Sequence, residues 1–112
     1  MLVSLLKPET TGKVAFSYDT LHTVPQDSGC YTLTTYEGRI LYIGQTIDIC
    51  KRMEQHLDDG SKRTQTPWGV VFWLHYRLCD ARDLNNLENG WFNEYVLTEG
   101  RMPFFNKARP PT

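Results

Sequence analysis

The chain has 112 residues, a formal net charge of −1, and ordinary shares of hydrophobic (40%) and charged (22%) residues. A chain of this length builds one hydrophobic core, so we expect a single domain. No apolar run approaches the ~20 residues that a membrane helix needs, and the first residues lack the charged start of a signal peptide. We therefore expect a cytoplasmic protein with no membrane partner.

The cysteines and the net charge exclude further classes. Cys30, Cys50 and Cys79 form no CxxC pair, and each stands beside apolar residues. They are interpreted as buried, reduced thiols and not as zinc ligands. The small negative charge counts against strong nucleic-acid binding by the whole surface, because phosphate contacts usually require a basic domain.

The first 24 residues carry no strong pattern, and we predict that they form an N-terminal extension that packs on the domain. Residues 31–34 are β-branched, aromatic or apolar and predict a strand. Glu37 and Gly38 supply a tight turn, in which the glycine can adopt positive φ. Residues 39–43 then predict the return strand of a hairpin.

A helix is predicted directly after this hairpin. Asp48 is a suitable N-cap, and apolar residues recur every four positions from residue 49 to residue 57. Arg52 and His56 are also four residues apart, so they lie one turn apart on a neighbouring face of the helix. The pattern therefore predicts a helix that buries one face and presents an arginine and a histidine together.

The second half predicts a loop, a strand and a helix. Residues 58–69 have loop composition, and residues 70–79 predict a central strand because both of its faces carry large side chains. Three aromatic residues here, His75, Trp68 and Trp73, are interpreted as packed core residues. An apolar stripe predicts a helix that begins near Asp80 and ends at Gly100; its members are Leu84, Leu87, Trp91 and Tyr95.

Two tripeptides in the hairpin carry a family resemblance. Residues 29–31 (Gly-Cys-Tyr) and 42–44 (Tyr-Ile-Gly) resemble the two halves of the GIY-YIG motif, and Arg52 stands at the position of that family's helix arginine. Residues 87–92 resemble the family's helix with its metal-binding glutamate, and residues 103–106 resemble its closing Pro-x-x-Asn element. The resemblance spans about residues 25–107.

The resemblance implies a fold and an activity. The expected fold is α/β, with a small, mainly antiparallel three-stranded β-sheet flanked by α-helices. The nuclease domain would span residues 25–107, between the extension 1–24 and a C-terminal tail 108–112. The implied activity is that of an endonuclease that hydrolyses DNA with one Mg²⁺ or Mn²⁺ ion and leaves 5′-phosphate and 3′-hydroxyl ends.

The resemblance also implies a set of site residues. The expected catalytic residues are Tyr31, Tyr42, Arg52, His56, Glu88 and Asn106. The expected substrate-binding residues are Gly44, Gln45, Lys51, Lys62, Arg63 and Lys107. Basic residues at or beside this site would supply the local positive charge that the whole chain lacks; Arg109 is a further one.

Chemical roles follow from the residue types. A hard cation such as Mg²⁺ can be held by one carboxylate because it keeps most of its waters, and Glu88 is the expected ligand, with Glu94 as a rival. Arg52 offers a planar fork of donors to the phosphate oxygens. Tyr31 would take a proton from water, directly or by a relay with His56, and the sequence does not decide whether Tyr31 or His56 is the general base. Asn106 would orient a neighbouring side chain or backbone group.

Two observations keep an alternative open. Gln45 stands where some members have a lysine, and the net charge is −1. A non-catalytic nucleic-acid-binding or assembly module with the same fold would fit both. The substrate is expected to be duplex, branched or single-stranded DNA, with specificity from a homodimer, a separate DNA-targeting protein or the substrate's own structure. Repair, restriction, homing and mobile-element processing are all compatible roles.

Overall fold

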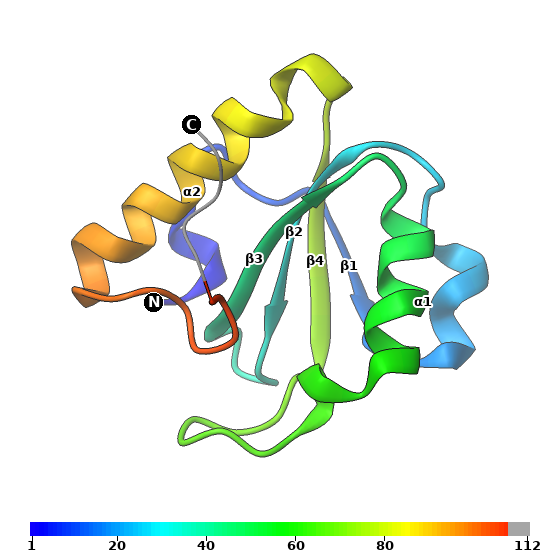
Figure 1. The fold of residues 1–112 in the computed structure, drawn as a ribbon, viewed down its shortest axis with the longest axis horizontal. Coiled ribbons are helices and arrows are strands. Elements are labelled where there is room, and N and C mark those ends of the chain that lie inside the picture. The colour runs from blue at the N-terminus through cyan, green and yellow to red at the C-terminus, as the bar shows by residue number, and fades with distance from the viewer. Residues whose placement is uncertain (108–112) are drawn as a thin grey trace.

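The computed structural model describes residues 1–107 and shows an α/β fold (Figure 1). The predicted tail 108–112 and Arg109 lie outside the described residues. No helix in the described part is both long enough and apolar enough to cross a membrane. The two α-helices and four strands are α1 (Ile49–Asp59), α2 (Leu84–Glu99), β1 (Gly12–Ala15), β2 (Gly29–Thr34), β3 (Ile40–Thr46) and β4 (Trp73–Leu78).

The sheet has four strands, so the prediction of three was wrong. All pairings are antiparallel, and the order is β1-β4-β2-β3. The additional strand, β1, comes from the segment that we expected to be an extension. It spans four residues, too few for an alternating pattern to show, and its pairing with β4 is a long-range contact that no local signal reports.

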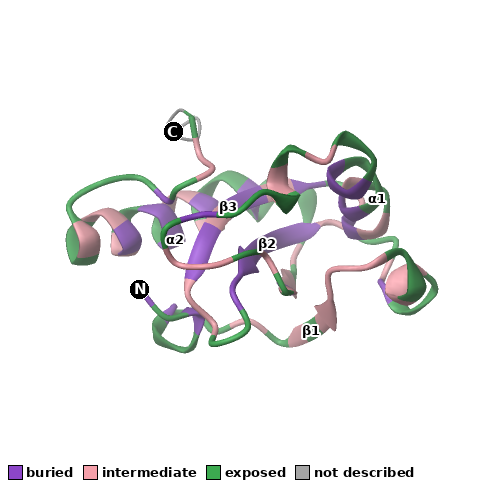
Figure 2. Ribbon diagram, turned by 90° about the horizontal axis from the view of Figure 1, so that it is seen from below, coloured by how far each residue is buried: buried purple, intermediate pink, exposed green. Residues whose placement is uncertain are grey.

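Two hydrophobic clusters lie on the two faces of the sheet. On one face α1 packs Ile49, Met53 and Leu57 against the strands. On the other face α2 packs the predicted apolar stripe, with Trp91 fully buried beside Leu6 of the N-terminal segment. Figure 2 shows β2 buried along its whole length between these layers. The sheet is therefore a rigid support, and β3 at its edge is available to carry a site.

The predicted caps of the two helices have different outcomes. Asp48 caps α1 as predicted, since its carboxylate accepts a hydrogen bond from the amide of Lys51. Gly100 ends α2 in the left-handed conformation (φ 74°), also as predicted. No side-chain cap bond is found at Asp80, where a short 3₁₀ turn, Ala81–Asp83, precedes α2.

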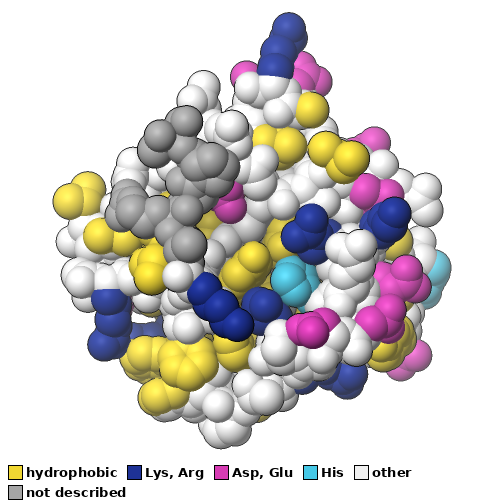
Figure 3. Space-filling model, in the orientation of Figure 1, with side chains coloured by type: hydrophobic (Ala, Val, Ile, Leu, Met, Phe, Trp, Pro, Cys, Tyr) yellow, Lys and Arg dark blue, Asp and Glu magenta, His cyan; other side chains and the backbone are white. Residues whose placement is uncertain are grey.

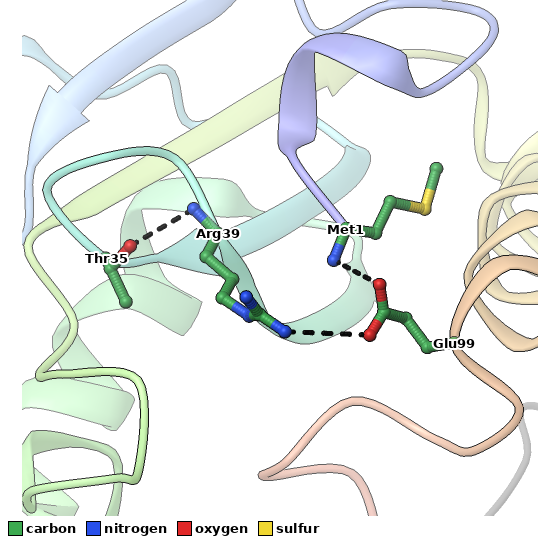
Figure 4. A network of polar contacts seen from close by, with 4 residues as sticks. All are labelled: Met1, Thr35, Arg39 and Glu99. Atoms are coloured by element: carbon green, nitrogen blue, oxygen red, sulfur yellow. Dashed lines mark hydrogen bonds and ion pairs between the residues drawn. The ribbon is translucent and has the colours of Figure 1, made fainter.

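A polar network joins the N-terminal segment, the hairpin and the end of α2 (Figure 4). The Met1 ammonium donates to Glu99 Oε2 at 2.7 Å, and Arg39 Nη2 lies 3.7 Å from Glu99 Oε1. The backbone amide of Arg39 donates to Thr35 Oγ1 at 3.1 Å. Three segments that are far apart in the sequence thus hold Arg39 in place.

His75 lies buried in β4, as the sequence predicted, and its Nε2 is 3.2 Å from Thr34 Oγ1. Trp73 and Trp68 are only partly buried, so their interpretation as core residues was wrong. Trp68 lies in the loop before β4, and Trp73 is the first residue of β4, so each is at the margin of the sheet and not in its core. Burial lowers the pKa of His75 to about 4, and nearby Lys13 adds to this effect.

The buried His75 predicts a loss of stability in acid. Its pKa is lower in the folded chain than the ordinary 6.5, so between about pH 6.5 and 4 the unfolded chain binds more protons. The free energy of unfolding should therefore fall across this window, by as much as ~3 kcal/mol from this group. Urea titrations at several pH values should show a smaller loss for His75→Gln. Equal losses in both proteins would contradict the assignment.

Candidate active site

The two motif tyrosines meet on the α1 face of the hairpin. The register pairs Tyr31 with Gly44 and Leu33 with Tyr42, so the two tyrosines are diagonal neighbours. Their ring centroids are 6.0 Å apart. Tyr31 is almost fully buried, whereas Tyr42 is half-buried. The pair therefore leads from the interior of the domain toward its surface.

α1 brings His56 against both tyrosines. The Tyr31 hydroxyl and His56 Nε2 are 2.7 Å apart, and the His56 ring meets the Tyr42 ring edge-on at 5.3 Å. Burial, helped by the positive charges of Lys62 and Arg52, lowers the pKa of His56 to about 4. Burial also raises the pKa of Tyr31. At neutral pH the phenol therefore keeps its proton and the imidazole is neutral, and the tautomer of His56 decides which of the two groups donates.

Cationic groups surround this hydrogen-bonded pair. Arg52 Nε is buried, and within residues 1–107 it has no hydrogen-bond partner. A buried donor without a partner is costly unless a ligand satisfies it. Lys62 Nζ lies 5.0 Å from the centroid of the Tyr42 ring, and burial lowers the pKa of this lysine. In Figure 3, Lys and Arg side chains gather with a histidine near the centre of the face between the helices.

Glu88 approaches from α2. It is buried, and its Oε1 accepts a hydrogen bond of 2.6 Å from Gln45 Nε2, which also donates to Asn85. Burial raises the pKa of Glu88, and the Gln45 bond opposes this shift. Within the described chain no three His, Cys, Asp or Glu residues cluster as metal ligands. The donor set fits a hard cation held by one carboxylate with most of its waters retained.

The C-terminal segment closes the edge of β3. Asn106 bonds in both directions with Ile43: its Oδ1 accepts from the backbone amide at 3.0 Å, and its Nδ2 donates to the carbonyl at 2.9 Å. The amide of Phe105 donates to the carbonyl of Leu41 at 2.9 Å. Asn106 thus contacts a backbone group beside Tyr42 and not the tyrosine ring.

The other expected residues are distributed unevenly. Lys107 is exposed and close enough to Lys62 to affect its pKa. Lys51 is exposed beside a depression of about 300 Å³ that Arg52 also lines. Arg63 lies over the Tyr18 ring, with 5.9 Å from its Cζ to the ring centroid, on the opposite side of α1 from β3. Glu94, the rival metal ligand, accepts a bond from the amide of Lys7.

Gly44 makes room for the tyrosine pair, which gives a testable prediction. A Cβ at this position would lie 2.7 Å from the Tyr31 hydroxyl and 2.9 Å from Cε2 of Tyr42. Gly44→Ala should therefore lower the free energy of unfolding by about 1–3 kcal/mol and separate the two rings. Gly90→Ala is the control: its Cβ meets nothing within 4 Å, so helix propensity should raise stability by about 1 kcal/mol. Chemical denaturation of both variants tests the contrast.

The comparisons agree with this geometry. The model of the GIY-YIG catalytic domain matches residues 27–98, which is most of the chain and includes the hairpin, α1 and nearly all of α2. The chain belongs to the GIY-YIG catalytic domain family. It is also 29% identical over 103 residues to UvrABC system protein C of Mycoplasma genitalium. That match covers 82% of this chain and 17% of the length of the relative.

Family membership confirms the resemblance that the tripeptides indicated, and it supports a nuclease-type function for the domain. The structure brings Tyr31, Tyr42, Arg52, His56 and Glu88 to one region from two strands and two helices. Sequence reasoning missed Asn85, which shares the amide of Gln45 with Glu88. Its position three residues before Glu88, one helical turn away, was the available signal.

Proposed function

We propose that this GIY-YIG domain is a divalent-metal-dependent endonuclease that hydrolyses DNA phosphodiester bonds. The observation that carries the proposal is the Tyr31–His56 hydrogen bond, which lies beside an unpartnered buried donor of Arg52. A neutral histidine, a protonated phenol and an unsatisfied guanidinium form an unusual group for a structural core. They suit a reaction in which a proton is moved and an anion must be bound.

The proposal assigns the general base, which the sequence left open between Tyr31 and His56. A tyrosine whose pKa is raised by burial cannot act as a phenolate base at neutral pH. In the proposed reaction Tyr31 gives its proton to His56 Nε2 as its oxygen takes a proton from the attacking water. The water oxygen then forms the new bond to phosphorus as the bond between phosphorus and the 3′ oxygen breaks, and the 3′ oxygen takes a proton from solvent. His56 is neutral before the reaction, because burial and the nearby cations disfavour its charged form. The negative charge of a bound phosphate would offset these cations and favour proton uptake by the imidazole.

In this proposal Arg52, Lys62 and a cation on Glu88 stabilise the negative charge of the phosphate. Arg52 would satisfy its free Nε on a non-bridging phosphate oxygen, where negative charge accumulates. Lys62 would bind a neighbouring phosphate. Glu88 would hold one Mg²⁺ or Mn²⁺ ion, which supplies Lewis-acid stabilisation of the phosphate and of the leaving oxygen. Gln45 and Asn85 keep the Glu88 carboxylate in position.

The products and the partners follow from the same proposal. Departure of the 3′ oxygen would leave 5′-phosphate and 3′-hydroxyl ends, as the family resemblance implies. This chain spans 17% of the length of the relative, so the proposal covers the catalytic domain alone. DNA specificity here is proposed to come from the structure of the substrate, a second copy or another protein.

The test is a cleavage assay with supercoiled, branched and single-stranded DNA in the presence of Mg²⁺, Mn²⁺ or EDTA. Metal-dependent conversion of supercoiled plasmid to nicked circles is the expected result. End-labelling should then find 5′-phosphates. If folded protein shifts DNA in a gel at low salt but cleaves none of these substrates with either metal, the domain is a binding module and not a nuclease.

A further inference from the structure

Trp68 lies between two arginines from distant parts of the chain. The Cζ atom of Arg39 is 4.9 Å from the centroid of the indole ring, and that of Arg101 is 5.0 Å from it. Phe104 meets the same tryptophan edge-on, with centroids 6.0 Å apart. Cation–π contacts of this kind contribute about 0.5–1 kcal/mol each at exposed sites and restrict the guanidinium groups. We name Arg39 and Arg101 the arginine pair.

The donors of the arginine pair remain available. Arg39 is held by Glu99, at a long 3.7 Å, through one of its nitrogens. Arg101 is exposed, and among residues 1–107 it makes no hydrogen bond or ion pair. Glu37 is a further carboxylate that lines the shallow pocket at Trp68 and Arg39. Two fixed guanidinium groups with free donors suit the planar, bidentate recognition of a phosphate.

The arginine pair also lies in line with the candidate active site. Arg39 comes directly before β3, the strand that carries Tyr42. The segment from Phe104 to Lys107 runs beside β3, fixed by the bonds of Phe105 and Asn106. Lys107 is close enough to Lys62 for its charge to lower the pKa of that lysine, and Lys62 lies at the Tyr42 ring. In Figure 3, hydrophobic side chains and further basic ones lie together at the lower left of the same face.

We propose that the arginine pair binds the DNA backbone on the same strand as the cleaved bond, beyond the phosphate that is cleaved. This rests on the proposed nuclease function and extends it to a second phosphate contact. Because the chain has a net charge of −1, its electrostatic affinity for DNA must come from such local groups of cations. Trp68 positions the guanidinium groups and contacts no DNA itself.

The test compares the salt dependence of DNA binding in EDTA, where no cleavage interferes. Fluorescence anisotropy with a labelled duplex, between about 50 and 200 mM salt, gives the slope of log affinity against log salt concentration. Arg101→Ala should lower the steepness of this slope by about one and weaken binding about threefold to tenfold at the lowest salt. Arg82→Ala is the matched control, since this exposed arginine pairs with Asp80 at the start of α2.

Neutral methylphosphonate substitutions then locate the contact. A neutral linkage at the bound position should weaken wild-type binding and leave Arg101→Ala unaffected, because the variant has already lost that contact. Trp68→Leu should give an intermediate slope with an unchanged far-ultraviolet circular dichroism spectrum. An Arg101→Ala slope equal to that of wild type overturns this inference and leaves the nuclease proposal intact. Absence of wild-type binding even at low salt overturns both.

Discussion

Glu88→Gln should lower the rate of metal-dependent DNA cleavage by about 10³-fold or more. The substitution keeps the shape of the side chain but removes the charge that would hold the cation. Lewis-acid stabilisation of a phosphate is worth several kcal/mol, and each 1.36 kcal/mol of barrier is about a tenfold change in rate. Fold stability should not fall, because the buried carboxylate is itself penalised by desolvation. Single-turnover cleavage and chemical denaturation measure the two effects.

The matched control is Glu94→Gln. Glu94 lies on the same helix, but its carboxylate accepts the amide of Lys7 and lies away from Gln45. The cleavage rate of this variant should stay within a few-fold of wild type. A rate loss in Glu94→Gln with none in Glu88→Gln would assign the metal to the rival carboxylate. Titration with Mn²⁺, followed by its relaxation signal, gives a readout that does not depend on turnover.

Tyr31→Phe and His56→Gln should each lower the cleavage rate by about 10²–10⁴-fold, the usual contribution of a positioned proton acceptor. Each variant breaks the 2.7 Å hydrogen bond that joins the relay. Because the two groups act as a unit, the double variant should be little slower than either single variant. Multiplicative losses would show that Tyr31 and His56 act independently.

The pH profile separates the relay from a simple histidine base. His56 must be neutral to accept the proton, and its pKa is lowered from 6.5 to about 4. The cleavage rate of wild type should therefore not fall through the range of an ordinary histidine, and its acid limb should lie nearer pH 4 to 5. Lys62→Ala removes one of the cations that lower the pKa of His56, so this limb should move to higher pH. If the acid limb of Lys62→Ala lies at the same pH as that of wild type, the charge of Lys62 does not lower the pKa of His56.

Local patterns predicted the elements that carry the site. The hairpin and α1 are correct because their signals lie within a few residues: a glycine turn, an Asp cap and apolar residues every four positions. The four-residue spacing of Arg52 and His56 correctly placed both on α1, next to the hairpin. Each of these features is decided by contacts close in the sequence, where periodicity and capping chemistry act.

Long-range contacts decided what the sequence could not show. β1 pairs with a strand about 60 residues away, and its own composition resembles a loop. The Tyr31–His56 bond joins residues 25 positions apart, and Gln45 reaches Glu88 across 43 positions. Trp68 looked like a core residue by type. Its exposure follows from the loop geometry that places it beside Arg39 and Arg101.

The bonds of Asn106 with Ile43 have a consequence for how this protein meets other chains. An open sheet edge is a template for strand addition and aggregation. The side-chain amide of Asn106 occupies the amide and carbonyl of Ile43 as a neighbouring strand would, and Phe105 occupies the carbonyl of Leu41. At the opposite edge β1 spans only four residues. The middle of one edge is thus occupied by the chain itself, and the other edge is short, so we expect both to resist strand addition and the strand that carries Tyr42 to resist amyloid-like pairing.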